Sequence, residues 1–377
     1  MNSAPDPPLS LAFLGDPNSI HTRRWLAFFA ERGHRIDLLV PTGQPIDAGL
    51  DERIRVDRFT AYPATRVRGL GSFVTRRALR RALRDVRPEI LHAHSLARYG
   101  WMAHLAGFRP FVVTVWGSDV LRAGSATWWT RRRSARALAA ASLVTAVSRP
   151  LADAAIRLGA RPDRTRIIQF GIDPDLFAPG PADEALRARL DAVGRRVVFA
   201  PRALRPLYRQ DVVVEALARL PEDVVAVFSD GGQDAAERAR LDDRAISLGV
   251  ADRLRIVPAI AHAQMPSYYR LADVVVSVPE SDAFPVTGLE AMATGVPLVM
   301  TDLPSTRDGL ASLDPEALVP VGDVVATAAA IRARLELAPA ARSDLAERLR
   351  GAAIERGDTR TNLLRMEAEY LRLRDRP

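Results

Sequence analysis

The chain has 377 residues, of which 48% are hydrophobic and 26% charged, a composition typical of globular proteins and not of disordered chains. It has no apolar run near the roughly 18 residues that cross a bilayer, and residues 1–10 lack the basic and apolar regions of a signal peptide. Without cysteine it cannot form a disulfide, an iron–sulfur cluster or a thiolate zinc site. We therefore expect a soluble cytoplasmic protein.

The charge is unevenly distributed along the chain. The 53 basic and 45 acidic residues give a net charge of +8, and every basic residue is arginine. Residues 1–150 hold 23 basic and 11 acidic side chains, a net of +12, whereas the rest holds 30 and 34, a net of −4. Such an excess attracts anions, such as phosphates or lipid headgroups, to the first part of the protein.

Short β-branched runs alternate with helical patterns in the first half of the chain. Runs bounded by turn residues predict buried parallel strands, and apolar residues at helical spacing predict helices between them. The predicted strands are residues 11–14, 36–40, 90–92, 111–115 and 143–147, and the predicted helices are residues 22–32, 72–86 and 96–105.

The same alternation then restarts, with predicted strands at residues 197–200, 224–228, 254–257, 274–278 and 298–300. Two such sets predict an α/β protein with two doubly wound, Rossmann-like domains. We place the boundary in residues 177–183, where Ala-Pro-Gly-Pro-Ala breaks both patterns. The domains are then residues 1–178 and 179–360, and residues 361–377, with a closing helix over 361–373, complete the first. Ligands bind at the carboxyl ends of parallel strands, so we expect a cleft between the domains.

Residues 281–297 form the strongest motif, a polar loop after a predicted strand and then a helix. Pro285 is placed to open the helix, Glu290 lies about one turn inside, and Gly295 is placed to end it. The free amides of a helix start form an anion site. The carboxylates of Asp282 and Glu290 could hold the hydroxyls of a sugar and a ribose. Alternatively, the segment is a plain strand–loop–helix with an acid that favours the helix dipole.

This motif resembles the signature of family-four retaining glycosyltransferases of the GT-B fold, in which two acids with seven residues between them precede Ala-Met-Ala-x-Gly-x-Pro. Further pieces agree in order and spacing over nearly the whole chain. They are residues 33–34, 91–94, 114–119, 146–148, 171–173, 230–232, 248–250 and 268–273.

The resemblance implies transfer of a sugar from a nucleotide donor, such as a UDP-, GDP- or ADP-sugar, with retention of the anomeric configuration. It places the donor on the C-terminal domain and the acceptor, a glycan, a lipid-linked group or a small molecule, on the N-terminal one. Such enzymes usually need no metal or other cofactor, and the sequence has no compact His/Asp/Glu ligand cluster. Protein cations and helix-terminal amides must then stabilise the departing nucleoside diphosphate.

The family typically has an arginine after the first strand of the C-terminal domain and a lysine six positions later. Arg202 matches the arginine, whereas position 208 is Tyr208. Arg205 or Arg209 could supply the second charge, because arginine binds phosphate in a bidentate manner. The alternative is that these arginines lie on a solvated loop.

The acid pair also departs from the family, whose first acid is usually glutamate. The resemblance implies that Asp282 meets sugar hydroxyls and Glu290 the ribose, with Phe284, Pro285 and Val286 forming the amide-rich turn between them. Aspartate is shorter than glutamate by about 1.5 Å. Either the loop lies closer to the sugar, or Glu280 takes the place of Asp282, or the enzyme prefers a different donor sugar. Asp282 could instead cap the helix.

In the first domain, polar residues follow several predicted strands. Family-matching histidines at the place of His94 lie near the reacting sugar, where the ring could orient a hydroxyl or share a proton; we prefer it to His92, which lies further from the strand end. Asp119 could bind the acceptor or accept a proton, or else cap a helix. We also expect the acceptor to contact an apolar wall at Trp116 and the loop after the first predicted strand at Gly15 and Asn18.

Two segments combine aromatic residues with arginines. Residues 72–86 place Phe73, Leu79, Leu83 and Val86 on one helical face and five arginines largely around the other, and residues 128–133 read Trp-Trp-Thr-Arg-Arg-Arg. Such surfaces suit peripheral contact with an anionic membrane. The alternative is a helix packed on its own sheet. No nucleic-acid-binding module is recognisable, so we expect no nucleic-acid partner.

Two further functions remain open from the sequence. A GT-B-shaped sugar-nucleotide epimerase or hydrolase would use a similar donor site. A degenerate nucleotide-sugar-binding protein would account for the absent lysine and the shortened acid.

Overall fold

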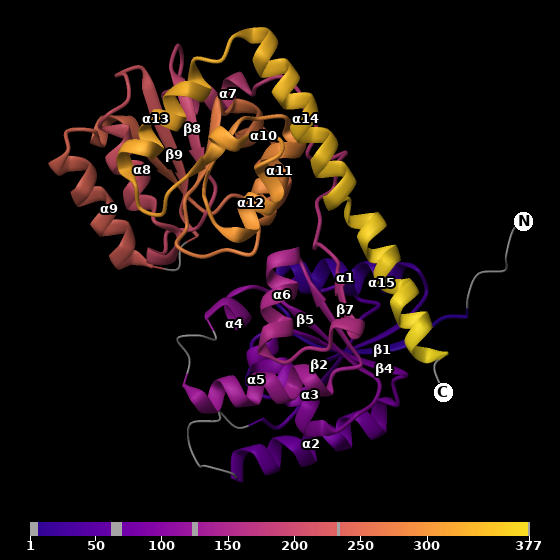
Figure 1. The fold of residues 1–377 in the computed structure, drawn as a ribbon. Helices are drawn as coiled ribbons and strands as arrows, with labels where there is room; N and C mark the ends of the chain where they lie inside the picture. Colours follow the sequence, from indigo (N-terminus) through magenta and orange to yellow (C-terminus); the bar gives the residue numbers. More distant parts are fainter. Residues whose placement is uncertain (1–6, 62–69, 123–126, 232–233, 376–377) are drawn as a thin grey trace, which may run out of the picture. The chain divides into compact units, whose positions relative to one another are not determined.

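The computed structural model describes residues 7–61, 70–122, 127–231 and 234–375, which form two compact units (Figure 1). Unit 1 comprises residues 1–169 and 361–377, and unit 2 comprises residues 170–360. The division falls before the predicted boundary at 178/179, because Ile172 and Phe177 are buried in the core of unit 2. The amide of Ile172 also donates to the carbonyl of Gly357, at 2.6 Å.

Unit 1 contains a seven-stranded parallel sheet in the order β3-β2-β1-β4-β5-β6-β7. Its strands are rich in buried valine, leucine and isoleucine, as expected of a sheet covered on both faces. The strands are β1 (Ser10–Leu14), β2 (Arg35–Pro41), β3 (Arg55–Phe59), β4 (Ile90–His94), β5 (Phe111–Val115), β6 (Leu143–Ala146) and β7 (Thr165–Ile167).

Helices cover both faces of this sheet (Figure 1). The closing helix α15 packs beside α1, where the rings of Tyr370 and Phe29 are 5.3 Å apart, and the Tyr370 hydroxyl lies 2.5 Å from Nδ1 of His92 in the sheet. The helices are α1 (Ile20–Glu31), α2 (Leu70–Val86), the π-helical turn η1 (Leu96–Gly100), α3 (Trp101–Ala106), α4 (Ser118–Leu121), α5 (Trp128–Ala140), α6 (Arg149–Leu158) and α15 (Thr359–Arg374).

Unit 2 contains a six-stranded parallel sheet in the order β10-β9-β8-β11-β12-β13. The strands are β8 (Arg196–Ala200), β9 (Val224–Ser229), β10 (Leu254–Val257), β11 (Val274–Ser277), β12 (Leu298–Thr301) and β13 (Leu318–Val319). The helices are α7 (Glu184–Arg189), α8 (Gln210–Leu217), α9 (Ala235–Ser247), α10 (Met265–Leu271), α11 (Val286–Thr294), α12 (Pro304–Leu310), α13 (Val324–Leu335) and α14 (Pro339–Gly357).

Alternate side chains of the central strand β8 enter two separate hydrophobic cores. Val197 and Phe199 pack in one, with residues of α10, α11 and α14, whereas Val198 and Ala200 pack in the other, with residues of α8, α9 and α13. The sheet is thus the middle of three layers.

All ten strands predicted from sequence are present, with end points that differ by at most two residues. Three strands were not predicted: β3, β7 and β13 are short or polar segments at or next to the sheet edges. Two predictions need correction. Residues 96–105 form η1 followed by α3 rather than one regular helix. Phe73 does not share the buried face of Leu79, Leu83 and Val86 but is 61% exposed.

Each sheet reverses its strand order at one point, between β1 and β4 in unit 1 and between β8 and β11 in unit 2. The crossovers leave this point in opposite directions, so loops diverge there and leave room for a ligand at the carboxyl ends. These two points are where functional side chains are expected.

Candidate active site

In unit 2, the loops that follow β8 and β11 are joined directly. The Glu280 amide donates to the Leu207 carbonyl at 3.0 Å, and Nη1 of Arg209 lies 3.3 Å from Oε1 of Glu280. The two loops therefore form one continuous surface at the point where the strand order reverses.

This surface brings Arg202 and Asp282 together. Nη2 of Arg202 lies 3.0 Å from Oδ2 of Asp282, and both side chains are largely buried. The guanidinium of Arg202 lies over the ring of Tyr208, 4.0 Å from its centroid, and the Arg202 carbonyl accepts a hydrogen bond from Gln210 at 2.8 Å. Tyr208 thus supports the arginine by a cation–π contact at the position where the family usually has lysine.

One carboxylate oxygen of Asp282 accepts a backbone hydrogen bond, and the other is available to a ligand. Its Oδ1 accepts a hydrogen bond from the Ala283 amide at 2.7 Å, and its carbonyl accepts one from the Ser305 hydroxyl at 2.7 Å. Oδ2 faces Arg202 but has no aligned hydrogen bond within the described part of the chain. Burial raises the pKa of Asp282, and the charge of Arg202 opposes that shift. The carboxylate does not cap α11, which is the alternative that the sequence left open.

The turn between Asp282 and α11 is tightly shaped. Phe284 has φ +78°, and its ring packs so closely on Gly309 that a Cβ there would lie 2.2 Å from it. Pro285 precedes the first residue of α11, Val286, and Gly295 ends the helix at φ +77°, as predicted. The first amides of α11 have no partner within the helix, so they provide an anion-binding end beside the Arg202–Asp282 pair.

Glu290 is buried, and its carboxylate contacts two other side chains of unit 2. It is 4% exposed, its Oε2 accepts a hydrogen bond from the Tyr269 hydroxyl at 2.8 Å, and its Oε1 lies 3.4 Å from Nε2 of His262. Burial and the adjacent Glu290 raise the pKa of Tyr269 well above its usual value. The contact of Glu290 with a ribose remains a prediction.

The two other candidate cations differ in their surroundings. Arg209 has φ +49° and is engaged by Asp211, at 3.1 Å, and by Glu280. Arg205 is exposed and forms no ion pair within the described ranges. Of the three arginines, Arg202 is therefore the one whose guanidinium is directed at the acid of the motif.

In unit 1, His94 ends β4 beside the loop that follows β1. A Cβ at Gly15 would lie 3.4 Å from Cβ of His94, and the His94 Nδ1 lies 3.3 Å from the Thr22 hydroxyl. Burial lowers the pKa of His94 to about 3, and His21 adds to the shift. Its Nε2 has no hydrogen-bond partner among the residues described. His94 is therefore a neutral imidazole with one nitrogen left to bind another group.

His92, by contrast, is fully engaged in the sheet. Its Nδ1 lies 2.5 Å from the Tyr370 hydroxyl and its Nε2 2.7 Å from that of Thr114, which is in turn 2.6 Å from Thr145. This geometry supports the preference for His94 over His92.

Asp119 organises two loops of unit 1. Its Oδ1 accepts hydrogen bonds from the amides of Trp116 and Gly117, at 3.0 and 2.9 Å, and its Oδ2 accepts one from the Leu96 amide at 2.8 Å. Burial raises the pKa of Asp119, and these amides oppose the shift. The contacts favour a positioning role over proton transfer, and they differ from the helix cap that we considered.

The residues predicted on the acceptor side divide into two groups. Gly15 and Trp116 both lie near His94, since the Trp116 and His94 ring centroids are 6.1 Å apart. Asn18 instead ties its loop to the next one: its Nδ2 donates to the Pro45 carbonyl at 3.3 Å, and its Oδ1 accepts from the Asp47 amide at 2.9 Å.

Several contributing residues were not identified from the sequence. Thr22 and Tyr269 contact the predicted histidine and glutamate, and Arg23 fixes the first loop through the carbonyls of Pro17 and Ala48. Thr22 and Arg23 lie in no recognisable motif, whereas Tyr269 belongs to residues 268–273 of the resemblance but was assigned no role. Gly231 belongs to residues 230–232 of the resemblance, and a Cβ there would lie 2.9 Å from Cβ of Ala203. Gly232, the next residue of the same piece, lies outside the described residues.

Two features are absent from the described residues. These residues contain no group of three or more His, Asp or Glu side chains that could hold a metal ion. Nor does any described helix have the length and apolar character needed to cross a membrane.

Two Rossmann-like units in one chain, with these strand orders, define a protein of the GT-B fold. The structure of HepE of Anabaena in complex with UDP has a TM-score of 0.80 to this one at 21% identity, covering 97% of this chain and all of that one. Sucrose-phosphate synthase from Thermosynechococcus elongatus has a TM-score of 0.81, also at 21% identity, covering 96% and 98%.

The chain belongs to the glycosyl transferases group 1. Residues 183–356 match that family, and residues 10–148 match the family described as glycosyl transferase 4-like. The D-inositol 3-phosphate glycosyltransferase of Geodermatophilus obscurus is 28% identical over 272 residues, 66% of this chain and 60% of that protein. That of Mycobacteroides abscessus is 36% identical over 143 residues, which cover 37% of this chain and 32% of that protein. The matches thus span less than two thirds of these curated relatives.

Proposed function

We propose that the chain transfers a sugar from a nucleotide-sugar donor to an acceptor, with retention of the anomeric configuration and without a metal ion. The observation that carries the proposal is the pairing of Arg202 with Asp282 beside the start of α11, at the strand-order reversal of unit 2. Among the possible donors, a UDP-sugar is the first candidate, because HepE binds UDP and UDP-glucose.

In this mechanism Arg202 and the first amides of α11 stabilise the negative charge that develops on the leaving diphosphate. Asp282 accepts hydrogen bonds from sugar hydroxyls, and Glu290 anchors the ribose end. These cationic and amide groups can perform the electrostatic role that a divalent ion has in other transferases, which is the support for metal independence.

Unit 1 supplies the acceptor side. Neutral His94, with its Nε2 available, orients a hydroxyl of the reacting sugar or of the acceptor, and Gly15 and Trp116 border the same place. A glycan, a lipid-linked group and a small molecule such as the inositol phosphate of the relatives all remain acceptor candidates.

Peripheral contact with an anionic membrane is part of the proposal. Trp128 and Trp129 are 60% and 54% exposed at the start of α5, with their rings stacked 3.8 Å apart, and Phe73 is exposed on α2. Both helices carry several arginines, and large exposed aromatic side chains among cations suit a lipid interface. Sedimentation with anionic vesicles at low and high salt tests this contact, and no binding at low salt would reject it.

The test of the activity is incubation with UDP-glucose and the corresponding GDP- and ADP-sugars, with and without candidate acceptors, followed by NMR of the products. A glycoside with the donor's anomeric configuration, formed equally with and without EDTA, supports the proposal. Free sugar alone would indicate a hydrolase, an isomerised donor an epimerase, and saturable binding without any product a binding protein.

A further inference from the structure

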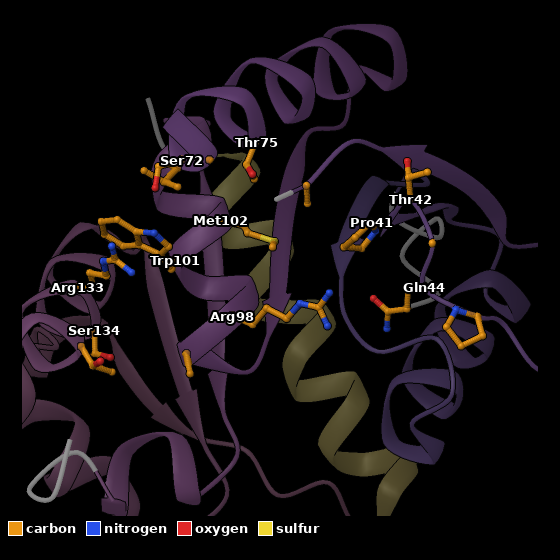
Figure 2. Close-up of a pocket in the computed structure, with 17 residues that line it drawn as sticks. Pro41, Thr42, Gln44, Ser72, Thr75, Arg98, Trp101, Met102, Arg133 and Ser134 are labelled. Atoms are coloured by element: carbon orange, nitrogen blue, oxygen red, sulfur yellow. The ribbon is translucent and has the colours of Figure 1, made fainter. Parts of the chain in front are cut away.

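Unit 1 contains a pocket of about 790 Å³ that the mechanism above does not use (Figure 2). It lies between the loop after β2, the start of α2, the η1–α3 segment and α5. Its volume falls in the range of small-molecule sites, which is about 300–1,000 Å³. A ligand much larger than an inorganic ion therefore fits.

The charge of the described lining residues is entirely positive. Arg98 and Arg133 line the pocket, no aspartate or glutamate does, and neither arginine forms an ion pair with any described carboxylate. Arg98 lies over the ring of Tyr99 at 5.4 Å and Arg133 over that of Trp101 at 5.4 Å. The positive charge of the lining favours an anionic ligand, such as a phosphate monoester with its roughly two negative charges.

The backbone before Arg98 is held in an unusual conformation. Ser95, directly after His94, has φ +88°, and the next five residues form the single π-helical turn η1. Strained residues and π-turns are concentrated at functional sites. Here they place Arg98 at the pocket four residues after His94, so the pocket and the strand end that we assign to the reaction share one loop.

The Arg98 side of the pocket also provides uncharged polar groups. Figure 2 shows the Arg98 side chain directed toward the side formed by Pro41, Thr42 and Gln44. Nε2 of Gln44 lies 3.3 Å from the Tyr99 hydroxyl and 3.3 Å from Oδ1 of Asp16. Oδ1 of Asp16 also accepts a hydrogen bond from the Asn18 amide at 3.0 Å, so the charge of this carboxylate is partly compensated.

The side of the pocket formed by α3 is apolar. Trp101, Met102 and Leu105 on α3 form its wall, and Figure 2 shows Arg133 beside Trp101. An anion alone would leave this wall uncovered, whereas a ligand with an apolar or pyranose face would cover it.

We propose that this pocket binds a phosphorylated acceptor: Arg98 and Gln44 hold a phosphate monoester, while Trp101, Met102 and Leu105 cover the face of the group that carries it. The proposal rests on the proposed function, because it takes the acceptor to bind unit 1. The phosphate could be carried by a soluble sugar or by a lipid.

The test measures binding to the full chain by tryptophan fluorescence and by vesicle sedimentation. Glucose 6-phosphate is compared with glucose, and phosphatidylcholine vesicles containing phosphatidic acid with phosphatidylcholine alone. Arg98→Ala should weaken binding of the phosphate-bearing probe about tenfold or more, and Arg98→Lys should restore part of it. Arg157→Ala, an exposed arginine on α6 that does not line the pocket, should bind as the wild type does.

An Arg98-dependent effect with glucose 6-phosphate supports a soluble acceptor, and one with phosphatidic acid alone supports a lipid-borne phosphate. Equal binding of glucose and its phosphate with no preference for phosphatidic acid, or equal binding by wild type and Arg98→Ala, overturns the proposal. UDP-glucose binding and turnover are measured in parallel. Their absence would count against the proposed function while leaving an Arg98-dependent phosphate site in place.

Discussion

Nη2 of Arg202 lies 3.0 Å from Oδ2 of Asp282, although the two residues are far apart in the chain. Each belongs to the loop that follows one of two adjacent strands, β8 and β11, so the sheet order itself produces the pair. A largely buried charge that loses its partner is costly. Each residue therefore holds the other in place until a ligand with its own charge and hydroxyls arrives.

Arg202→Ala is expected to lower kcat/KM with a nucleotide-sugar donor by about 10²-fold, because it removes the cation nearest the anion-binding start of α11. Arg205→Ala, which removes an equal charge from the same loop, should change kcat/KM by no more than about threefold, since rim charges contribute little. Steady-state kinetics of both variants provide the measurement. Equal losses would show that the pairing with Asp282 does not identify the phosphate-binding arginine.

Tyr208 is expected to act through its ring rather than its hydroxyl. Tyr208→Phe should keep the wild-type Kd for UDP, whereas Tyr208→Leu should raise it roughly three- to tenfold, because a cation–π contact contributes about 0.5–1 kcal/mol or more. Tyr208→Lys introduces the residue more usual in the family, but it places a second cation against Arg202 at the site of a 4.0 Å contact. Calorimetric titration with UDP ranks the three variants. Tighter binding by the lysine variant would argue against support of Arg202 by the ring.

The sequence predicted the fold through its buried strands and predicted the site through its strand ends. β8 and β11 have apolar runs that leave little ambiguity, and Arg202 and Asp282 lie in the loops that follow them. Strands β3 and β13 were not predicted, because β3 is mostly polar and β13 has only two residues, so neither shows an apolar run. Tyr269 could not be assigned to Glu290, because that contact depends on how α10 packs on α11. Nor does any local pattern predict the π-turn that places Arg98.

Asp119 offers a direct test of positioning against proton transfer. Asp119→Asn presents an amide NH₂ to backbone N–H groups that now donate to both carboxylate oxygens, so it should destabilise unit 1 by about 2 kcal/mol. A positioning residue leaves the shape of the pH–rate profile unchanged, and the residual activity should therefore show the same limbs as the wild type. Loss of one limb in the variant would instead identify Asp119 as the general base.

The burial of His94 predicts a stability difference that depends on pH. Its pKa of about 3 in the folded unit lies below the value of about 6.5 expected in the unfolded chain, so the unfolded state binds more protons as the pH falls below about 6.5. The stability that neutral His94 contributes is therefore lost progressively as the pH falls from about 6.5 toward 3. Relative to His94→Gln, the wild type should lose about 2 kcal/mol of unfolding free energy between pH 7.5 and 5.

Urea unfolding followed by tryptophan fluorescence measures this difference, because all five tryptophans belong to unit 1. The neighbouring titratable groups, His92 and His21, are present in both proteins, so the difference reports His94 together with its electrostatic coupling to them. A constant difference across this pH range would mean that His94 is reached by solvent in the folded protein. In that case it could carry a proton during the reaction, and the neutral hydrogen-bonding role proposed for it would fail.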